Sequence, residues 1–337
     1  MSPLLELTVT RLRLFFREPG AIFWTFGFPI VLALALGIAF RNRPPEPVFV
    51  AVESIALQQQ LASAPELRVE LLEDAAARAA LRTGRASLVV LPGAPRTYLF
   101  DPTRPESRLA RALADAALQR ADGRRDPTLT RDQPVTEPGS RYIDFLIPGL
   151  IGMTLMSSGM WGIGYVVVEM RTRKLLKRLV ATPMNRAQFL FSFVLMRVAF
   201  LFLELPILVG FGWLAFSVGV AGSIGTLVLV SVLGALAFGG IGLLVASRAQ
   251  NNQTASGLIN LVMMPMFIGS GVFFSTQRFP GVVQPFLRAL PLTALNDALR
   301  GVMIEGAGVR ALAAPLLLLA AIAVVSFAVA LRVFRWR

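Results

Sequence analysis

The chain has 337 residues, of which 55% are hydrophobic and 16% are charged, and its formal net charge is +13 at pH 7. Soluble domains carry about 25% charged residues, so this composition excludes an ordinary soluble protein and indicates an integral membrane protein. The absence of cysteine and histidine excludes disulfide bonds, thiol catalysis and the commonest side-chain base and metal ligand.

Residues 1–20 are predicted to form an amphipathic helix on the membrane surface. At helical spacing, one face is apolar and the adjacent face is polar; the apolar set is Leu5, Val9, Leu12 and Phe16, and the polar set is Glu6, Thr10, Arg13 and Arg17. Helices of this kind commonly anchor proteins at a membrane interface. The stretch REPG at 17–20 is expected to end this helix before the first span.

An α-helix needs roughly 20 apolar residues to cross the hydrocarbon core of a membrane. The segments that meet this requirement are Ile22–Phe40, Phe145–Val168, Phe189–Phe216, Ile224–Ser247, Ala255–Phe274 and Leu312–Leu331. Six spans place the arginine-rich short loops and both chain ends on one side, which the positive-inside rule makes cytoplasmic. The predicted fold class is therefore an α-helical integral membrane protein with six transmembrane helices. The first of them, 21–40, has no cleavage pattern and is expected to be retained.

Residues 41–144 have mixed charge and predict a small inserted α/β domain, which the six-span topology places outside the cytoplasm. Short strands are expected at 48–52, 67–72, 86–91 and 96–100, with helices at 55–63, 73–86 and 105–121. In the last helix, Leu109, Leu113 and Ala117 form the expected apolar stripe. A folded spacer and a ligand-binding domain both fit this pattern, and residues 122–140 read as a loose connector.

The segment EMRTRKLLKRLVATP, residues 169–183, contains both lysines of the chain and has helical periodicity. Its apolar stripe is Leu175, Leu176, Leu179 and Val180. Glu169 and Arg173 stand four residues apart in the order that favours an ion pair. Thr182 and Pro183 are expected to start the next helix. The pattern predicts a short amphipathic helix at the cytoplasmic interface, held there either by anionic lipid or by a protein partner.

Residues 275–308 are too long for a turn and too polar for a lipid-facing span. Pro285 and Pro291 interrupt this segment, and Leu295, Leu299 and Val302 form an apolar stripe beside Asp297 and Arg300. One or two short helices are expected to enter the outer leaflet and return over 276–308. Such a break is tolerated only where the backbone is buried in protein or lines a cavity.

The chain resembles the membrane permease of the type-2 exporter class of ATP-binding cassette transporters, in the branch with a large extracytoplasmic domain after the first span. The similar segments are REP (17–19), LIPGLIGMTLMS (146–157), EMRTRKLLKRLVATPMNRAQFL (169–190) and LPLTALNDALRGVMIEG (290–306). The third resembles the family's segment around its coupling helix. Arg173 and Lys174 stand where that family usually has a glycine.

The resemblance implies that a separate cytoplasmic ATPase docks against the coupling helix, expected over 169–188 within the span-bearing region 145–337. The coupling residues that it implies are Glu169, Arg171, Arg173, Lys174, Lys177, Arg178 and Pro183. The chain has no G-x-x-x-x-G-K-[ST] phosphate loop. It is therefore not expected to be an enzyme or to hold a cofactor, and ATP and Mg²⁺ are expected on the partner ATPase.

The resemblance also implies a functional pair, either a homodimer or a close heterodimer, with the substrate pathway between the two copies. The expected setting is the bacterial inner membrane, in contact with membrane lipid and without nucleic acid. The expected activity is efflux of drugs or other lipophilic compounds. Two other classes are a membrane sensor that uses residues 41–144 and an intramembrane enzyme. The enzyme would need clustered acid, base or metal ligands, whereas without histidine or cysteine the spans offer only Glu204 and a few carboxylates at their rims.

Several polar or adaptable side chains are candidates for the pathway or the dimer contact: Glu204, Asn260, Met264, Asp297 and Arg300. Arg197 and Glu204 stand seven residues apart on one face of the third span. Arg197 is expected to extend toward the cytoplasmic surface, and Glu204 to line the pathway or pair with a neighbouring helix. The glycines expected at close helix contacts are Gly149, Gly152, Gly159, Gly162, Gly234, Gly239, Gly240 and Gly242.

Overall fold

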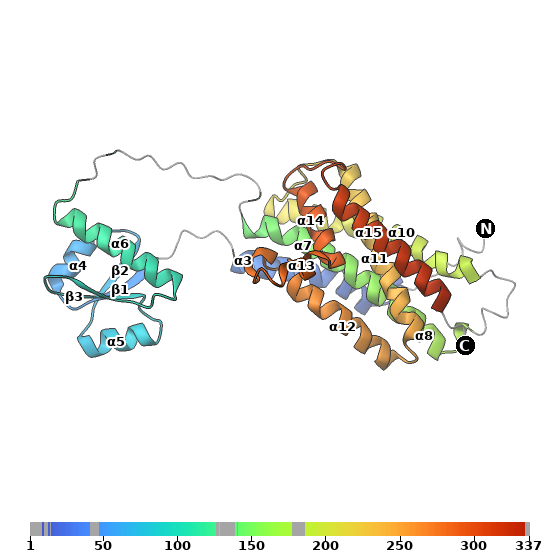
Figure 1. Ribbon diagram of the computed structural model, residues 1–337, viewed down its shortest axis with the longest axis horizontal. Helices are drawn as coiled ribbons and strands as arrows, with labels where there is room; N and C mark the ends of the chain where they lie inside the picture. Colours follow the sequence, from blue (N-terminus) through green and yellow to red (C-terminus); the bar gives the residue numbers. More distant parts are fainter. Residues whose placement is uncertain are drawn as a thin grey trace. The chain divides into compact units, whose positions relative to one another are not determined.

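The computed structural model describes residues 15–40, 47–125, 141–176 and 186–333, together with the single positions 9, 13, 128 and 139. It separates into two compact units (Figure 1). The helical unit comprises Met1–Arg41 and Val135–Arg337, and the α/β unit comprises Asn42–Pro134. Most of the predicted amphipathic helix over 1–20 lies outside the described residues.

The α/β unit is built on a four-stranded sheet in the order β2-β1-β3-β4. Its strands are β1 (Val48–Val52), β2 (Leu67–Leu71), β3 (Leu88–Leu91) and β4 (Thr97–Leu99). The first three are parallel, and β4 runs antiparallel to β3. Helices α4 (Ile55–Leu61) and α6 (Pro105–Ala121) pack on one face and α5 (Asp74–Arg82) on the other (Figure 1).

The buried face of α6 differs from the predicted stripe. Leu109 is 52% exposed, so its place in that stripe is wrong. The buried residues of α6 are Ser107, Ala110, Ala114, Ala117 and Leu118. Small side chains bring the helix backbone close to the sheet. A prediction that relies on large apolar residues therefore does not identify this alanine face as the buried one.

The helical unit contains a series of helices of unequal length. They are α2 (Pro19–Ile22), η1 (Phe23–Gly27), α3 (Phe28–Ala39), α7 (Tyr142–Gly159), η2 (Met160–Tyr165), α8 (Val166–Thr172), α10 (Arg186–Phe216), α11 (Ile224–Arg248), α12 (Asn252–Gly269), η3 (Thr276–Arg278), α13 (Gln284–Arg288), α14 (Pro291–Met303) and α15 (Ala313–Val333). The segments η1 and η2 are π-helical, and η3 is a 3₁₀ helix. As expected from REPG, the chain turns at Arg17 and is extended at Glu18 before Pro19 starts α2.

Four helices within the described residues are long and apolar enough to cross a membrane: Tyr142–Thr172, Phe191–Phe216, Ile224–Arg248 and Ala313–Val333. The first of these is α7, η2 and α8 in continuous succession. The predicted span Ile22–Phe40 corresponds to a shorter apolar helix, Phe23–Ala39. The predicted span Ala255–Phe274 ends early, because α12 stops at Gly269 and Gly271 adopts a positive φ of 71°. That residue turns the chain toward α14.

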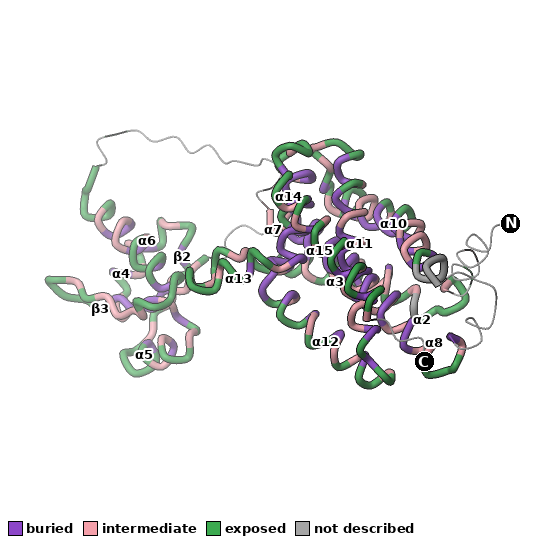
Figure 2. The backbone as a smooth tube through the Cα atoms, turned by 45° about the vertical axis from the view of Figure 1, so that its right-hand side comes forward, coloured by how far each residue is buried: buried purple, intermediate pink, exposed green. Residues whose placement is uncertain are grey.

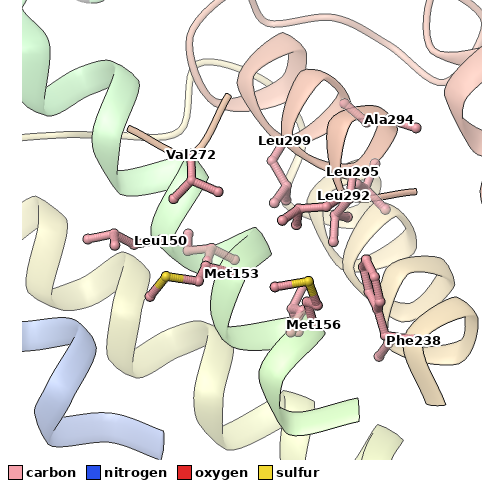
Figure 3. Packing of buried hydrophobic residues seen from close by; sticks show 14 of the residues in the cluster. Leu150, Met153, Met156, Phe238, Val272, Leu292, Ala294, Leu295 and Leu299 are labelled. Carbon is pink, nitrogen blue, oxygen red and sulfur yellow. The ribbon is translucent and has the colours of Figure 1, made fainter. Parts of the chain in front are cut away.

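Helix α11 lies at the centre of the helical unit, packed against α7, η2, α10, α14 and α15. Buried residues concentrate where these helices meet (Figure 2). Figure 3 shows Met153 and Met156 of α7 among Phe238 of α11 and the leucines of α14. Helix α14 is buried along most of its length, so it is a packed part of the bundle. The predicted stripe Leu295, Leu299 and Val302 is confirmed as buried.

Glycines allow the span Tyr142–Thr172 to approach α11 backbone to backbone. A Cβ atom added at Gly159 would lie 2.7 Å from Cβ of Phe238, and one added at Gly242 would lie 2.5 Å from the carbonyl oxygen of Gly159. This confirms the predicted close contact at these two glycines. Gly162 contradicts the prediction, because an added Cβ there would meet nothing within 4 Å.

Candidate functional site

The span Tyr142–Thr172 is bonded to other helices by charged side chains near its beginning, in its middle and at its end. The first and last of these places coincide with sequence segments that carry the family resemblance, 146–157 and 169–190.

Near the beginning of the span, Arg300 of α14 binds main-chain carbonyl groups from two other segments. Its Nε and Nη2 atoms donate hydrogen bonds of 3.3 Å to the carbonyl oxygen of Phe145, and Nη2 also donates to the carbonyl oxygen of Gly271. The guanidinium carbon lies 3.5 Å from the centroid of the Phe145 ring. Nη1 lies 4.0 Å from the Asp297 carboxylate, which is mostly exposed. Arg300 therefore joins α7, α14 and the turn after α12.

The same junction depends on two glycines of α7. A Cβ atom added at Gly149 would lie 2.6 Å from the carbonyl oxygen of Val272, and one added at Gly152 would overlap Oδ1 of Asn296. The Asn296 amide donates a 2.9 Å hydrogen bond to the carbonyl oxygen of Ser270. The segments 146–157 and 290–306, far apart in sequence, thus pack directly on one another.

In the middle of the span, Ser158 contacts a buried ion pair of α10. Nη1 of Arg197 lies 2.6 Å from Oε2 of Glu204, and the two side chains are 5% and 1% exposed. The Ser158 hydroxyl lies 3.0 Å from Oε1 of Glu204. The expectation that Arg197 extends to the membrane surface is wrong, because Glu204 provides a closer partner and keeps the guanidinium inside the protein. The pairing of Glu204 with a neighbouring helix is found, through Ser158 of α7.

At the end of the span, Arg171 binds the carboxyl-terminal end of α11. Its Nη1 atom donates to the carbonyl oxygens of Ala246 and Ala249, at 2.8 and 2.6 Å. The last carbonyl groups of a helix lack partners within the helix and carry partial negative charge, so an arginine both satisfies and neutralises them. Arg171 was expected to face a partner or lipid, whereas the structure directs it into the protein, where it joins α8 to α11.

The neighbouring basic residues point elsewhere. The predicted pair of Glu169 and Arg173 is confirmed by an N–O distance of 2.7 Å, although the Arg173 side chain is 70% exposed. Lys174 is exposed and adopts a positive φ of 60°. This left-handed conformation is unfavourable for a residue with a Cβ atom. Arg173 and Lys174 are the residues that stand where the resembled family usually has a glycine. The turn is followed by Leu176, which is buried in a cluster with residues of α8, α11 and α12.

Of the predicted coupling helix over 169–188, the structure therefore describes the end of α8, the turn at Arg173 and Lys174, and the helical residues 175–176. Lys177, Arg178 and Pro183 lie outside the described residues, as do Leu179, Val180 and Thr182. Helix α10 begins at Arg186.

The remaining candidates do not gather into one site. Asn260 is exposed on α12, on the same face as Met264, Leu261 and Ile268, whose exposed fractions are 60%, 69% and 65%. Asp297 is exposed on α14, while Glu204 is enclosed between α10 and α7. Sequence reasoning missed Ser158 and Asn296. A signal was present for Ser158, which lies beside Gly159 in a segment whose glycines recur at helical spacing.

The α/β unit has a shallow groove of about 550 Å³ between α5 and the edge strand β4. Its lining residues are Arg78, Leu81, Arg82, Tyr98, Leu99, Phe100 and Pro102. The pKa of the Tyr98 hydroxyl is raised to about 12, mainly by burial and to a smaller extent by the hydrogen bond to Asp115. In the part of the chain that the structure describes, no group of three or more acidic side chains is placed to hold a metal ion.

Two comparisons relate this chain to known proteins. The profile of a family described as "ABC-2 family transporter protein" matches residues 19–332. ABC transporter G family member 20 of Dictyostelium discoideum is 28% identical over 208 residues, which are 61% of this chain and 28% of that relative. The chain thus spans less than a third of that relative's length. The family match includes the three polar contacts of the span Tyr142–Thr172.

Proposed function

The chain belongs to the ABC-2 family of transporter proteins, as a membrane component, and we propose that it is the permease of an ATP-driven exporter of drugs or other lipophilic compounds. The family implies a separate ATP-binding subunit as partner. The observation that carries the proposal is the arrangement at Arg171, which ties the end of the span Tyr142–Thr172 to the end of α11 beside exposed basic residues.

This arrangement suits a surface that receives motion from an ATPase. Arg173 and Lys174 are exposed at the end of α8 and carry the charge that a docked partner would contact. Arg171 is bonded to α11, and Leu176 is buried in the adjacent apolar cluster. A displacement of the turn at Arg173 and Lys174 is therefore transmitted to two helices that cross the core of the bundle.

The substrate pathway and the pairing surface are proposed along the exposed face of α12. Asn260 lies there among Leu261, Met264 and Ile268, so a hydrogen-bonding amide is surrounded by large and adaptable apolar side chains. Such a surface suits lipophilic molecules or a second permease copy, in either a homodimer or a close heterodimer. The buried ion pair of Arg197 and Glu204 lies within one copy and is assigned to neither role.

We place the chain in the bacterial inner membrane, with both termini in the cytoplasm and the α/β unit outside it. Supporting this orientation, basic residues are exposed at the ends of helices that the topology assigns to the cytoplasmic side. They are Arg13, Arg17, Arg173, Lys174, Arg248 and Arg332. Basic residues in short loops favour retention on that side.

The test is ATP hydrolysis by candidate cassette ATPases of the same organism, measured with and without the purified chain in lipid nanodiscs. Stable association and a changed rate are expected. Arg173→Glu with Lys174→Glu should abolish the change, while the matched pair Arg82→Glu with Arg85→Glu, exposed on the α/β unit, should not. Normal stimulation by the first pair would remove these charges from the docking surface.

The groove of the α/β unit favours a second candidate function, that of a membrane sensor. Failure of the chain to bind any ATPase would support this alternative.

A further inference from the structure

Helix α13 and the turns before it expose large apolar side chains at one end of the helical unit. Val282 and Phe286 are 83% and 74% exposed, and Phe274 and Val283 are also exposed. Leu287 of α13 is buried near Gly269 at the end of α12. The short helix is therefore anchored by one leucine, while the neighbouring valines and Phe286 are exposed. We call Phe274, Val282, Val283 and Phe286 the α13 patch.

The segment that carries the α13 patch has only basic charges, and the acidic group that acts on one of them is the exposed Asp297 of α14, which interacts with Arg288. Arg278 and Arg288 flank it and are exposed. No acidic residue occurs between Ser270 and Asn296. The ligand that fits this pattern has an apolar part for the valines and phenylalanines and an anionic part for the guanidinium groups.

The position of the patch in the chain sets its level relative to the membrane. The patch lies between the end of α12 and the beginning of α15, which is long and apolar enough to span a membrane. The hydroxyl of Tyr142, at the start of another such span, donates a 3.2 Å hydrogen bond to the carbonyl oxygen of Phe273. Helices that cross the bilayer therefore meet at this level, which is where headgroups and acyl chains border each other.

We propose that the α13 patch binds the lipid leaflet on that side, with its apolar side chains at the acyl boundary and Arg278 and Arg288 on phosphates of anionic headgroups. Amphipathic segments of this kind hold proteins at membrane interfaces. A second copy of the chain fits less well. A two-fold contact brings the same surface of both copies together, so it would gather the arginines of both copies in one interface. The inference is independent of ATPase binding.

The natural absence of cysteine makes the test direct. Single cysteines at Val282 and Phe286, and at the exposed polar control position Gln277, are spin-labelled in the full chain in nanodiscs. Collision rates with oxygen, which concentrates in lipid, and with a water-soluble nickel chelate are then compared. We expect labels at Val282 and Phe286 to favour oxygen several-fold over the label at Gln277. Equal nickel access at all three positions would overturn the proposal.

The anionic part is tested by lipid composition. Val282→Cys should sit deeper in nanodiscs containing phosphatidylglycerol than in discs of phosphatidylcholine alone, and Arg278→Gln with Arg288→Gln should remove that difference. An unchanged difference would overturn the assignment of these arginines to headgroups. Labels shielded from both reagents and broadened by a neighbouring label would instead identify a second copy as the occupant, which also overturns the proposal.

Discussion

The two ends of the span Tyr142–Thr172 are both held by an arginine that donates to main-chain carbonyl oxygens, but the surroundings differ. Near the beginning, Arg300 of α14 stacks on Phe145 and lies next to Gly149, where a side chain larger than hydrogen would not fit. At the end, Arg171 belongs to the span itself and reaches α11, beside an exposed Arg173. One junction is packed around backbone atoms, and the other is a side-chain tether.

The difference indicates how the two junctions respond to force. Backbone packed against backbone through glycine has no flexible group to absorb a displacement, and close-packed interiors transmit strain. A long arginine side chain can keep its hydrogen bonds while the helices that it joins shift slightly. The beginning of the span is therefore expected to be the fixed point, and the end to be the part that the proposed ATPase would move.

The largest effect is expected between the two junctions, at the buried ion pair of α10 that contacts Ser158 in the middle of the span. Glu204→Leu alone leaves Arg197 buried without its counter-charge and should cost about 3–5 kcal/mol of stability. Glu204→Leu with Arg197→Leu should recover most of that loss, because both buried charges are gone. Thermal denaturation in detergent checks both variants. Equal losses in the single and double variants would show that packing, and not the uncompensated charge, causes the effect.

Gly152→Ala should be the next most harmful change and tests the fixed junction. The added methyl group overlaps Oδ1 of Asn296, whose helix is buried, so neither side is able to yield. Overpacking of this kind costs about 3 kcal/mol. Gly162→Ala is the matched control in the same span, with open space around the added methyl group. It should be neutral or stabilising by up to about 1 kcal/mol. Similar melting temperatures for the two variants would refute the fixed junction.

Local features of this structure could be predicted from the sequence because their partners are close in the chain. Strand β1 has the predicted bounds, 48–52, and the pair of Glu169 and Arg173 forms at the predicted helical spacing. The hydrogen-bond partners of Arg171 and Arg300 could not be predicted from the sequence, because their carbonyl acceptors lie up to 78 and 155 residues away. A carbonyl oxygen is also present at every residue, so no sequence pattern marks which one an arginine will bind.

The same lack of information on distant contacts explains why Arg171 was predicted to lie on a docking surface but binds α11 instead. The basic run and the family resemblance placed Arg171 with the residues of a docking surface, because burial of one member of a basic cluster leaves no trace in composition. The sequence marked Arg197 and Glu204 as unusual charges within a span, but it left open whether Arg197 binds Glu204 or extends to the membrane surface. The packing of α10 beside α7 buries both side chains, so that they bind each other.

Removing either arginine should separate the two junctions experimentally. Arg300→Gln loses bonds to two carbonyl groups and the stack on Phe145, so a loss of about 2–3 kcal/mol for the whole helical unit is expected. Arg171→Gln should cost about 1–2 kcal/mol and raise amide hydrogen exchange mainly over 244–252. Mass spectrometry of exchanged peptides distinguishes them. A global effect of Arg171→Gln as large as that of Arg300→Gln would contradict a movable end.

The smallest expected effect concerns Lys174, whose left-handed backbone forms the turn at the movable end. Lys174→Gly relieves a strain of about 1 kcal/mol, whereas Lys174→Ala removes the same charge and keeps the strain. The glycine variant should therefore melt at a higher temperature than the alanine variant, and equal melting would show that the turn is unstrained. Stimulation of the partner ATPase then separates charge from geometry. Loss in both variants assigns coupling to the lysine charge, because the turn is preserved in the glycine variant. Retention in the glycine variant alone assigns coupling to the turn itself, for which a glycine is then sufficient.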